Sequence, residues 1–215
     1  MTRFKTFSAL IAGVLTLTGT LALAGCASDT DAAKPAPDPK PTVNSNAPAG
    51  SDAVEDFLTA NGLAGKSANQ IVDHLDQLGG SARPTNYMAS IRADEIVFIT
   101  DDGEMELAMP EDEFYVSIAP FRENTHPCTF HSLTTCQGEL TGEDFQVEVK
   151  TDAGEVILDE QRTSFQNGFI GLWLPRDITG TITITDDAGQ AGQVEFATDS
   201  GGATCITTLQ IPKAA

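Results

Sequence analysis

Residues 145–158 read Phe-Gln-Val-Glu-Val-Lys-Thr-Asp-Ala-Gly-Glu-Val-Ile-Leu. The first five alternate between apolar and polar side chains, which is typical of a β-strand with one buried face. Asp152-Ala153-Gly154 predicts a tight turn, and Val156-Ile157-Leu158 predicts the strand that returns from it. The segment therefore predicts an antiparallel hairpin.

Similar short runs, separated by acidic and glycine-containing turns, occur on both sides of this hairpin. They predict strands at 95–100, 104–109, 114–119, 169–174, 181–185, 193–197 and about 204–211. The run at 169–174 is continuously apolar and contains Trp173, which indicates an inner strand. Frequent turns at short intervals favour an antiparallel sandwich or barrel over a βαβ fold.

Two short helices are expected before the strands. Asp52 with Glu55, and Ser67 with Gln70, have the spacing of capping boxes. Apolar stripes follow each start, and glycines end them at Gly62 and at 79–80. We therefore expect an α+β fold, with a small helical segment at 51–83 and a mainly antiparallel, sandwich-like domain at 84–215. His74 lies beside the second stripe and is expected to be a surface or boundary residue rather than a metal ligand.

The first 25 residues have the features of a secretion signal. Arg3 and Lys5 precede an apolar stretch at 7–24, and Leu23-Ala24-Gly25-Cys26 forms a lipobox. A transmembrane anchor and a plain cleaved signal are the alternatives. The run is short for a spanning helix, and the small residues before Cys26 favour a lipoprotein. Cys26 would carry the lipid, on the outer face of the cytoplasmic membrane or elsewhere within the cell envelope.

Residues 26–50 predict a disordered tether behind that lipid. Prolines stand at 35, 37, 39, 41 and 48, and Val43 is the one large aliphatic residue. Such a segment buries too little apolar surface to fold, and alternating prolines hold it extended. The predicted role is to lift the folded part off the membrane.

The chain is strongly acidic. Its formal net charge is −19, and removal of a signal that contains Arg3 and Lys5 takes it to −21. A chain of this charge repels phosphate backbones, which excludes nucleic acid as a partner. The acidity is otherwise explained by solubility.

The cysteine count is the most informative feature of the composition. Four cysteines less Cys26 leave Cys128, Cys136 and Cys205, an odd number outside the cytoplasm. One of them must be free, cross a dimer interface or bind a metal. Cys128 and Cys136 lie in a predicted loop at 124–140, whereas Cys205 begins the last predicted strand.

This loop also contains His126 and His131, so thiols and imidazoles are clustered. Thiolates are soft ligands that suit Cu(I), and three of them can surround it in a plane. Imidazoles suit Cu(II) or zinc, and here they would form an entry site or orient the thiols. These residues are therefore candidates for a copper site that binds Cu(I) through Cys128, Cys136 and Cys205, with His126 and His131 as secondary candidates.

Three alternatives remain open on these residues. Two cysteines could form a structural disulfide with the third buried, since extracellular thiols usually oxidise. Zinc could bind the same residues, although it prefers a fourth ligand. A catalytic cysteine and histidine pair is the third, but the sequence shows neither an orienting residue nor a nucleophile signature.

Three stretches together resemble the CueP family of copper-binding proteins from the periplasm of Gram-negative bacteria. They are Phe-Tyr-Val-Ser-Ile-Ala-Pro-Phe at 114–121, Thr-His-Pro-Cys-Thr-Phe-His-Ser-Leu-Thr-Thr-Cys-Gln-Gly-Glu-Leu at 125–140, and Cys-Ile-Thr-Thr-Leu at 205–209. The resemblance extends over roughly 52–211. It implies three Cu(I)-binding cysteines, which correspond to Cys128, Cys136 and Cys205.

The resemblance also implies roles and partners. Members sequester copper outside the cytoplasm, supply it to a copper/zinc superoxide dismutase and protect against copper stress. They are linked to thiol-dependent reduction of Cu(II), with thiol-disulfide oxidoreductases restoring the thiols, and to a homodimer of two-part chains. The lipobox and tether depart from the periplasmic members, which puts a freely diffusing carrier in doubt. We expect a copper-binding protein first, with cupric reductase activity as the alternative.

Overall fold

The computed structural model describes residues 51–213; the predicted signal, Cys26 and the tether lie outside this range. Within residues 51–213 it has two α-helices, a short 3-10 helix and ten strands. The helices are α1 (Ser51–Ala60), α2 (Ala68–Asp76) and η1 (Gly80–Ala82). The strands are β1 (Met88–Ile91), β2 (Glu95–Thr100), β3 (Gly103–Ala108), β4 (Glu113–Ile118), β5 (Asp144–Thr151), β6 (Val156–Thr163), β7 (Ile170–Pro175), β8 (Thr179–Asp186), β9 (Ala191–Ala197) and β10 (Cys205–Ile206).

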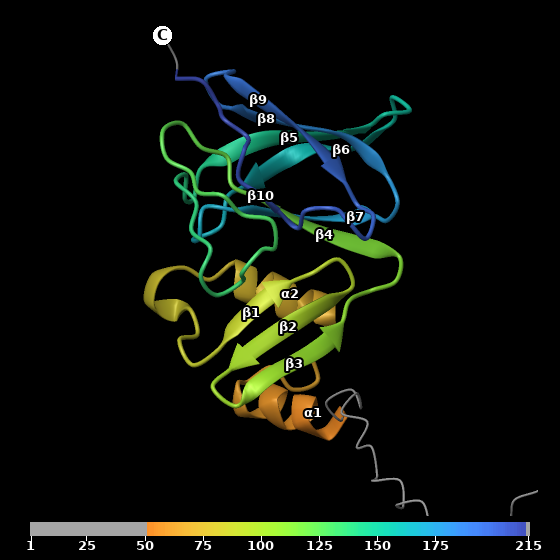
Figure 1. The fold of residues 1–215 in the computed structure, drawn as a ribbon. Helices are drawn as coiled ribbons and strands as arrows, with labels where there is room; N and C mark the ends of the chain where they lie inside the picture. Colours follow the sequence, from red (N-terminus) through yellow and green to blue (C-terminus); the bar gives the residue numbers. More distant parts are fainter. Residues whose placement is uncertain (1–50, 214–215) are drawn as a thin grey trace, which may run out of the picture. The chain divides into compact units, whose positions relative to one another are not determined.

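The β-rich part is a sandwich of two sheets, as predicted. One sheet has the strand order β6-β5-β8-β9 and the other β10-β4-β7 (Figure 1). Every pair is antiparallel except β10 with β4. The alternation of 145–149 places Phe145, Val147 and Val149 in the core between the sheets, together with apolar residues of β4, β7 and β8.

Strand β4 has two buried faces. Phe114, Val116 and Ile118 enter the sandwich core, whereas Tyr115 and Ser117 point to the opposite side, toward α2. All five side chains are buried. The sheet β10-β4-β7 is thus a middle layer that joins the sandwich to the N-terminal part.

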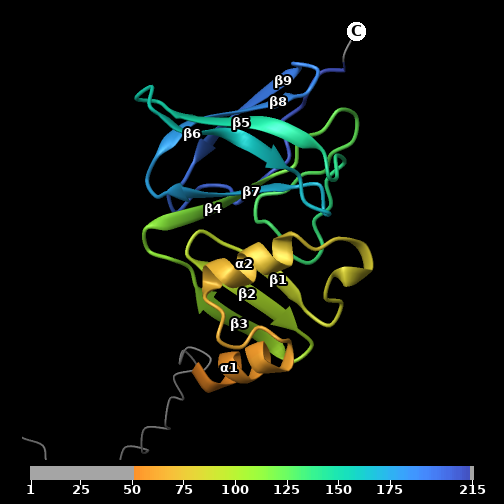
Figure 2. The ribbon, with the colours of Figure 1, turned by 180° about the vertical axis from the view of Figure 1, so that it is seen from behind.

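The N-terminal part packs both α-helices with the antiparallel sheet β1-β2-β3 around a second core. Helix α2 covers one face of this sheet (Figure 2). The capping box at Ser67 and Gln70 is confirmed, and α2 buries Ile71, Val72 and Leu75 as its apolar stripe predicted. Strand β1 was not predicted, because its four residues are too short to show an alternation.

Two details of the predicted strands were wrong. Among the strands of residues 51–213, the run at 169–174 forms β7 at a sheet edge, where it pairs only with β4. Its continuous apolarity reflects burial on two faces, since Leu172 lies in the sandwich core and Trp173 packs against the N-terminal core. The last strand shrinks from 204–211 to Cys205–Ile206, followed by a single bridge between Phe121 and Gln210.

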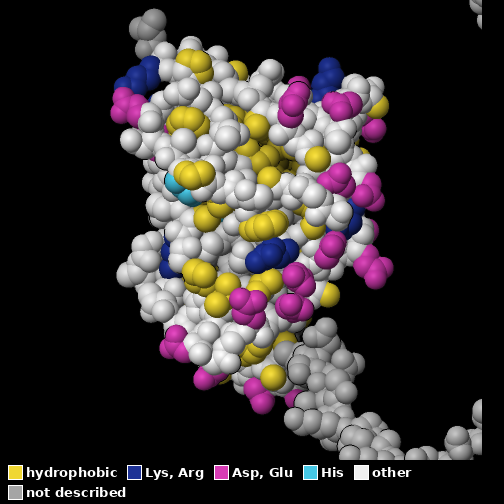
Figure 3. All heavy atoms as spheres, in the orientation of Figure 1, with side chains coloured by type: hydrophobic (Ala, Val, Ile, Leu, Met, Phe, Trp, Pro, Cys, Tyr) yellow, Lys and Arg dark blue, Asp and Glu magenta, His cyan; other side chains and the backbone are white. Residues whose placement is uncertain are grey.

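The surface carries the acidity seen in the sequence. Figure 3 shows acidic side chains on the viewed face over both the sandwich and the N-terminal sheet, with basic side chains scattered between them. His74 is exposed on α2, as predicted. Within 51–213, neither α-helix has the length and apolarity that a membrane crossing requires.

Candidate metal centre

The loop at 124–140 contacts both parts of the protein. The backbone N–H of Ile91 donates to the carbonyl of His131 at 2.7 Å, and that of Leu133 donates to the carbonyl of Ala89 at 2.8 Å. Leu133 is fully buried in the N-terminal core. These contacts with β1 hold the middle of the loop in one place, between its two cysteines.

A second set of hydrogen bonds attaches the loop to the end of the chain. The backbone N–H of Cys205 donates to the carbonyl of Thr129 at 3.1 Å. The hydroxyl of Thr204 accepts from the backbone N–H of His131 at 3.0 Å and donates to the carbonyl of Ile91 at 2.8 Å. Because β10 also pairs with β4, Cys205 is fixed against the loop that carries the other two cysteines.

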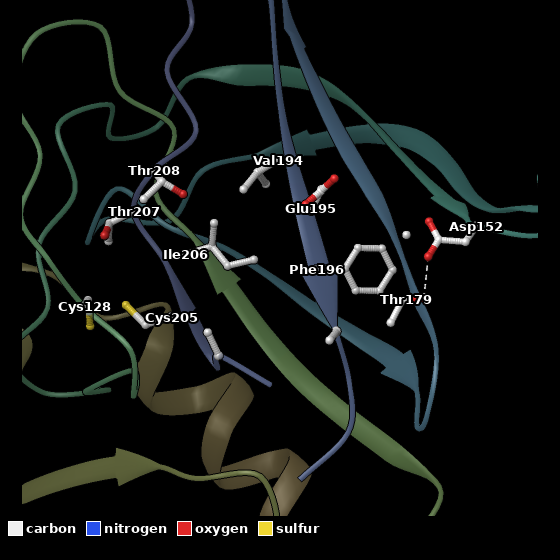
Figure 4. Close-up of a pocket in the computed structure, with 13 residues that line it drawn as sticks. Cys128, Asp152, Thr179, Val194, Glu195, Phe196, Cys205, Ile206, Thr207 and Thr208 are labelled. Atoms are coloured by element: carbon white, nitrogen blue, oxygen red, sulfur yellow. Dashed lines mark hydrogen bonds between the residues drawn. The ribbon is translucent and has the colours of Figure 1, made fainter. Parts of the chain in front are cut away.

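The three thiols converge. The Sγ atoms of Cys128 and Cys136 are 3.6 Å apart, and all three described cysteines are free thiols. Figure 4 shows Cys128 and Cys205 side by side. A disulfide needs sulfurs about 2.05 Å apart, so the structural-disulfide alternative is not the arrangement seen here.

The donor atoms fall into two overlapping sets in the described part of the chain. His126, Cys128 and Cys136 form the outer set, and His131, Cys136 and Cys205 form the inner set; within each, all donors lie within 4.8 Å of one another. The outer set is half-buried throughout, whereas His131 and Cys205 are buried. Cys136 belongs to both sets.

This spacing fits a soft metal ion. An ion with trigonal sulfur ligands at about 2.3 Å holds those sulfurs about 4.0 Å apart. The 3.6 Å between Cys128 and Cys136 is close to that value, the Sγ of Cys205 lies within 4.8 Å of that of Cys136, and Cys205 shifts the pKa of both other thiols. The three thiols can therefore enclose a small ion after only a minor adjustment of side chains.

Asp76 is the feature of the site that the sequence analysis missed. It ends α2 and is fully buried, and its Oδ1 lies 2.6 Å from Nε2 of His131. Its carboxylate also accepts hydrogen bonds from Tyr115 at 2.7 Å, Ser117 at 2.9 Å and Asn167 at 2.7 Å. The helical spacing could have revealed this buried aspartate, because Asp76 follows Val72 by four residues on the buried face of the helix.

The carboxylate orients His131 toward the sulfurs. With Nε2 occupied by Asp76, Nδ1 of His131 is the ring nitrogen left for the inner set. Among the buried side-chain nitrogens and oxygens of residues 51–213, this Nδ1 alone lacks a hydrogen-bond partner. Asp76 thus supplies the orienting residue that the sequence did not reveal.

The protonation states of Asp76, His131 and the cysteines depend on one another. Burial lowers the pKa of His131, but the Asp76 carboxylate outweighs it and raises the pKa to about 9. The pKa of Cys136 falls to about 3, through the hydrogen bond from Cys205 and then through His131. Burial raises the pKa of Cys128 to about 11. At neutral pH, Cys136 is therefore the ready thiolate, and metal binding must displace the proton of Cys128.

Comparisons with known proteins agree with this geometry. A family model described as "Periplasmic copper-binding protein CueP" matches residues 70–210. The chain belongs to the CueP family. A solved structure titled "Crystal Structure of S.CueP" is 41% identical, with a TM-score of 0.70, and the match covers 77% of this chain and 99% of that one. None of the curated proteins matches the chain.

Membership of the CueP family makes copper the metal to consider and places the protein in the periplasmic, exported class. All five loop and strand residues named from the sequence, namely Cys128, Cys136, Cys205, His126 and His131, meet in this one cluster. Which of them bind copper, and in which oxidation state, remains a prediction. Lipidation of Cys26 also remains a prediction, because that residue lies outside the described range.

The cluster of thiols and imidazoles in this CueP family member opens onto a groove beside β9. The groove has a volume of about 560 Å³, and Cys128 and Cys205 lie at one end of it. Val194, Phe196 and Ile206 form its apolar wall (Figure 4), and Figure 3 shows hydrophobic side chains in a hollow over this part of the sandwich. The thiols are therefore reached from the side of the sandwich.

Proposed function

We propose that this chain is an extracytoplasmic lipoprotein that binds Cu(I) through the thiolates of Cys128, Cys136 and Cys205. Its role is copper sequestration, transfer and resistance to copper stress. The observation that carries the proposal is the convergence of thiols from a mid-chain loop and from β10 in a member of a copper-binding family. Sulfur is the soft donor that favours Cu(I) over harder divalent ions.

A thiol-dependent Cu(II) reductase is the second candidate. The 3.6 Å between the sulfurs of Cys128 and Cys136 favours it, because closing that gap forms a disulfide. The two thiolates would give one electron to each of two Cu(II) ions and leave two Cu(I) ions and one disulfide. Thiol-disulfide oxidoreductases would then restore the dithiol.

Counting free thiols separates the two functions. A binding protein that meets Cu(I) without oxygen keeps three titratable thiols after the metal is removed by a chelator. A reductase that meets Cu(II) loses two thiols for every two ions reduced. We expect all three thiols to survive Cu(I) loading of the chain with Cys26 changed to serine. Loss of two thiols with Cu(II), and their recovery with a reductant over repeated cycles, would establish the reductase instead.

Lipid anchoring is tested at Cys26. The Cys26→Ser change removes the atom that would carry the lipid, so we expect the chain to move from the membrane fraction to the soluble fraction. Cell fractionation and metabolic labelling with a fatty acid measure this. Equal membrane association of the wild type and the variant would contradict the lipoprotein assignment.

An anchored protein delivers copper to what its tether reaches. A copper/zinc superoxide dismutase is the proposed recipient, and a homodimer is the proposed assembly. Residues 27–50 would span roughly 3.1 Å per residue where they adopt a polyproline helix. Delivery is therefore proposed to partners close to the same membrane face.

A further inference from the structure

The outer set differs from the three-thiol site by a single donor. It replaces Cys205 with His126 and keeps Cys128 and Cys136. His126, Cys128 and Cys136 are each half-buried, whereas Cys205 is 2% exposed. The ring of His126 packs near the buried Phe169, with centroids 6.4 Å apart, so the imidazole is held at the boundary between solvent and the thiols.

We infer that the outer set is an entry and exit position for Cu(I), distinct from the position where the ion rests. The inference rests on the proposed function. An arriving ion binds His126, Cys128 and Cys136, and Cys205 then takes the place of His126. Cys128 and Cys136 stay bound throughout, so the ion never loses more than one ligand at a time. Release follows the same steps in reverse.

Each ligand exchange is balanced in bonds and protons. On the way in, the bond between copper and the His126 nitrogen breaks, and a bond to Sγ of Cys205 forms. The Cys205 thiol gives its proton to water as its sulfur binds. The oxidation state of copper does not change, so neither an oxidant nor a reductant is needed.

The outer set is more exposed to solvent than Cys205, and this difference explains why an entry position is useful. Cys205 is covered by the loop through its backbone hydrogen bond to Thr129, and it packs with the buried residues Ala119 and Phe169. A bulky donor protein or chelator has little access to the thiol of Cys205, which lines the groove but is only 2% exposed. It can reach the half-buried sulfurs and imidazole of the outer set, from which the ion passes inward.

The first test is kinetic. Cu(I) is presented to the full chain as a complex with a coloured chelator, and capture is followed by stopped flow, without oxygen. We expect His126→Gln to slow capture and release by at least about tenfold, the effect of one lost interaction of ordinary strength on a rate. The equilibrium Kd should change less than about threefold, because the resting ligands are intact. His74→Gln, on the exposed face of α2, is the matched control.

The second test traps the ion at the entry position. In Cys205→Ser, the resting site lacks its third sulfur, so residual Cu(I) should show two sulfurs and one nitrogen by X-ray absorption. Adding His126→Gln should remove that nitrogen. Unchanged exchange rates in His126→Gln together with no nitrogen in Cys205→Ser would overturn the inference. Absence of Cu(I) binding by the wild type would instead overturn the proposed function.

Discussion

Replacing Cys205 with serine is expected to weaken Cu(I) binding by at least about 100-fold, because even changes outside the ligand shell cost 10 to 100-fold. The thiol of Cys205 comes from β10, whereas its two partners come from one loop. A hydroxyl is a hard, protonated donor that does not replace a thiolate for this ion. Competition with a chelator of known affinity, under anaerobic conditions, measures the change.

The control for this variant is Thr208→Ser, which alters an exposed residue lining the same groove. We expect its affinity to equal that of the wild type. An unchanged affinity in Cys205→Ser would show that copper, if bound, is held elsewhere. It would favour a surface domain in which the cysteines have a structural role.

Replacing Asp76 with alanine is expected to destabilise the fold by about 3–5 kcal/mol, the cost of removing one partner from a buried ion pair. The change leaves the imidazole of His131 buried without its carboxylate. It also removes the acceptor used by the hydroxyls of Tyr115 and Ser117. Because Asp76 joins α2 to β4 and to the metal loop, both cores lose a shared contact. Chemical denaturation of the metal-free protein measures the effect.

Asp73 provides a matched control on the same helix. Its carboxylate accepts one hydrogen bond from Trp173 at 2.9 Å in an exposed setting, so Asp73→Ala should cost about 1 kcal/mol or less. A loss in Asp76→Ala no larger than in Asp73→Ala would contradict the account of the buried pair.

The contribution of Asp76 should also depend on pH. Burial raises its pKa, but His131 and the hydrogen bonds lower it more, so the folded pKa lies below 3.8. A lowered pKa stabilises the folded state above the unfolded value and ceases to do so as pH falls through the folded value. The stability difference between wild type and Asp76→Ala should therefore shrink in acid.

Local patterns predicted the strands better than their places in the sheets. The alternation at 145–149 and the turn at 152–154 depend on neighbouring residues, and both hairpin strands formed where expected. The role of β7 depended on what covers its faces and edges, which the sequence does not state. Continuous apolarity was therefore mistaken for an inner position.

In the candidate site too, features set by neighbouring residues could be predicted, and features set by contacts between distant residues could not. Cys128, Cys136, His126 and His131 lie within eleven residues, so their clustering was visible in the sequence. The position of Cys205 depends on the parallel pairing of β10 with β4, a contact between residues far apart in the chain. The orienting role of Asp76 depends on the packing of α2 against β4, which places its carboxylate beside His131.

X-ray absorption on the wild-type chain loaded with one equivalent of Cu(I) tests whether Cys128, Cys136 and Cys205 hold the ion. A three-thiolate site should give a shell dominated by sulfur, with three ligands at about the 2.3 Å expected for metal–thiolate bonds. A shell dominated by nitrogen would move the ion to His126 and His131 and contradict the three-thiolate site.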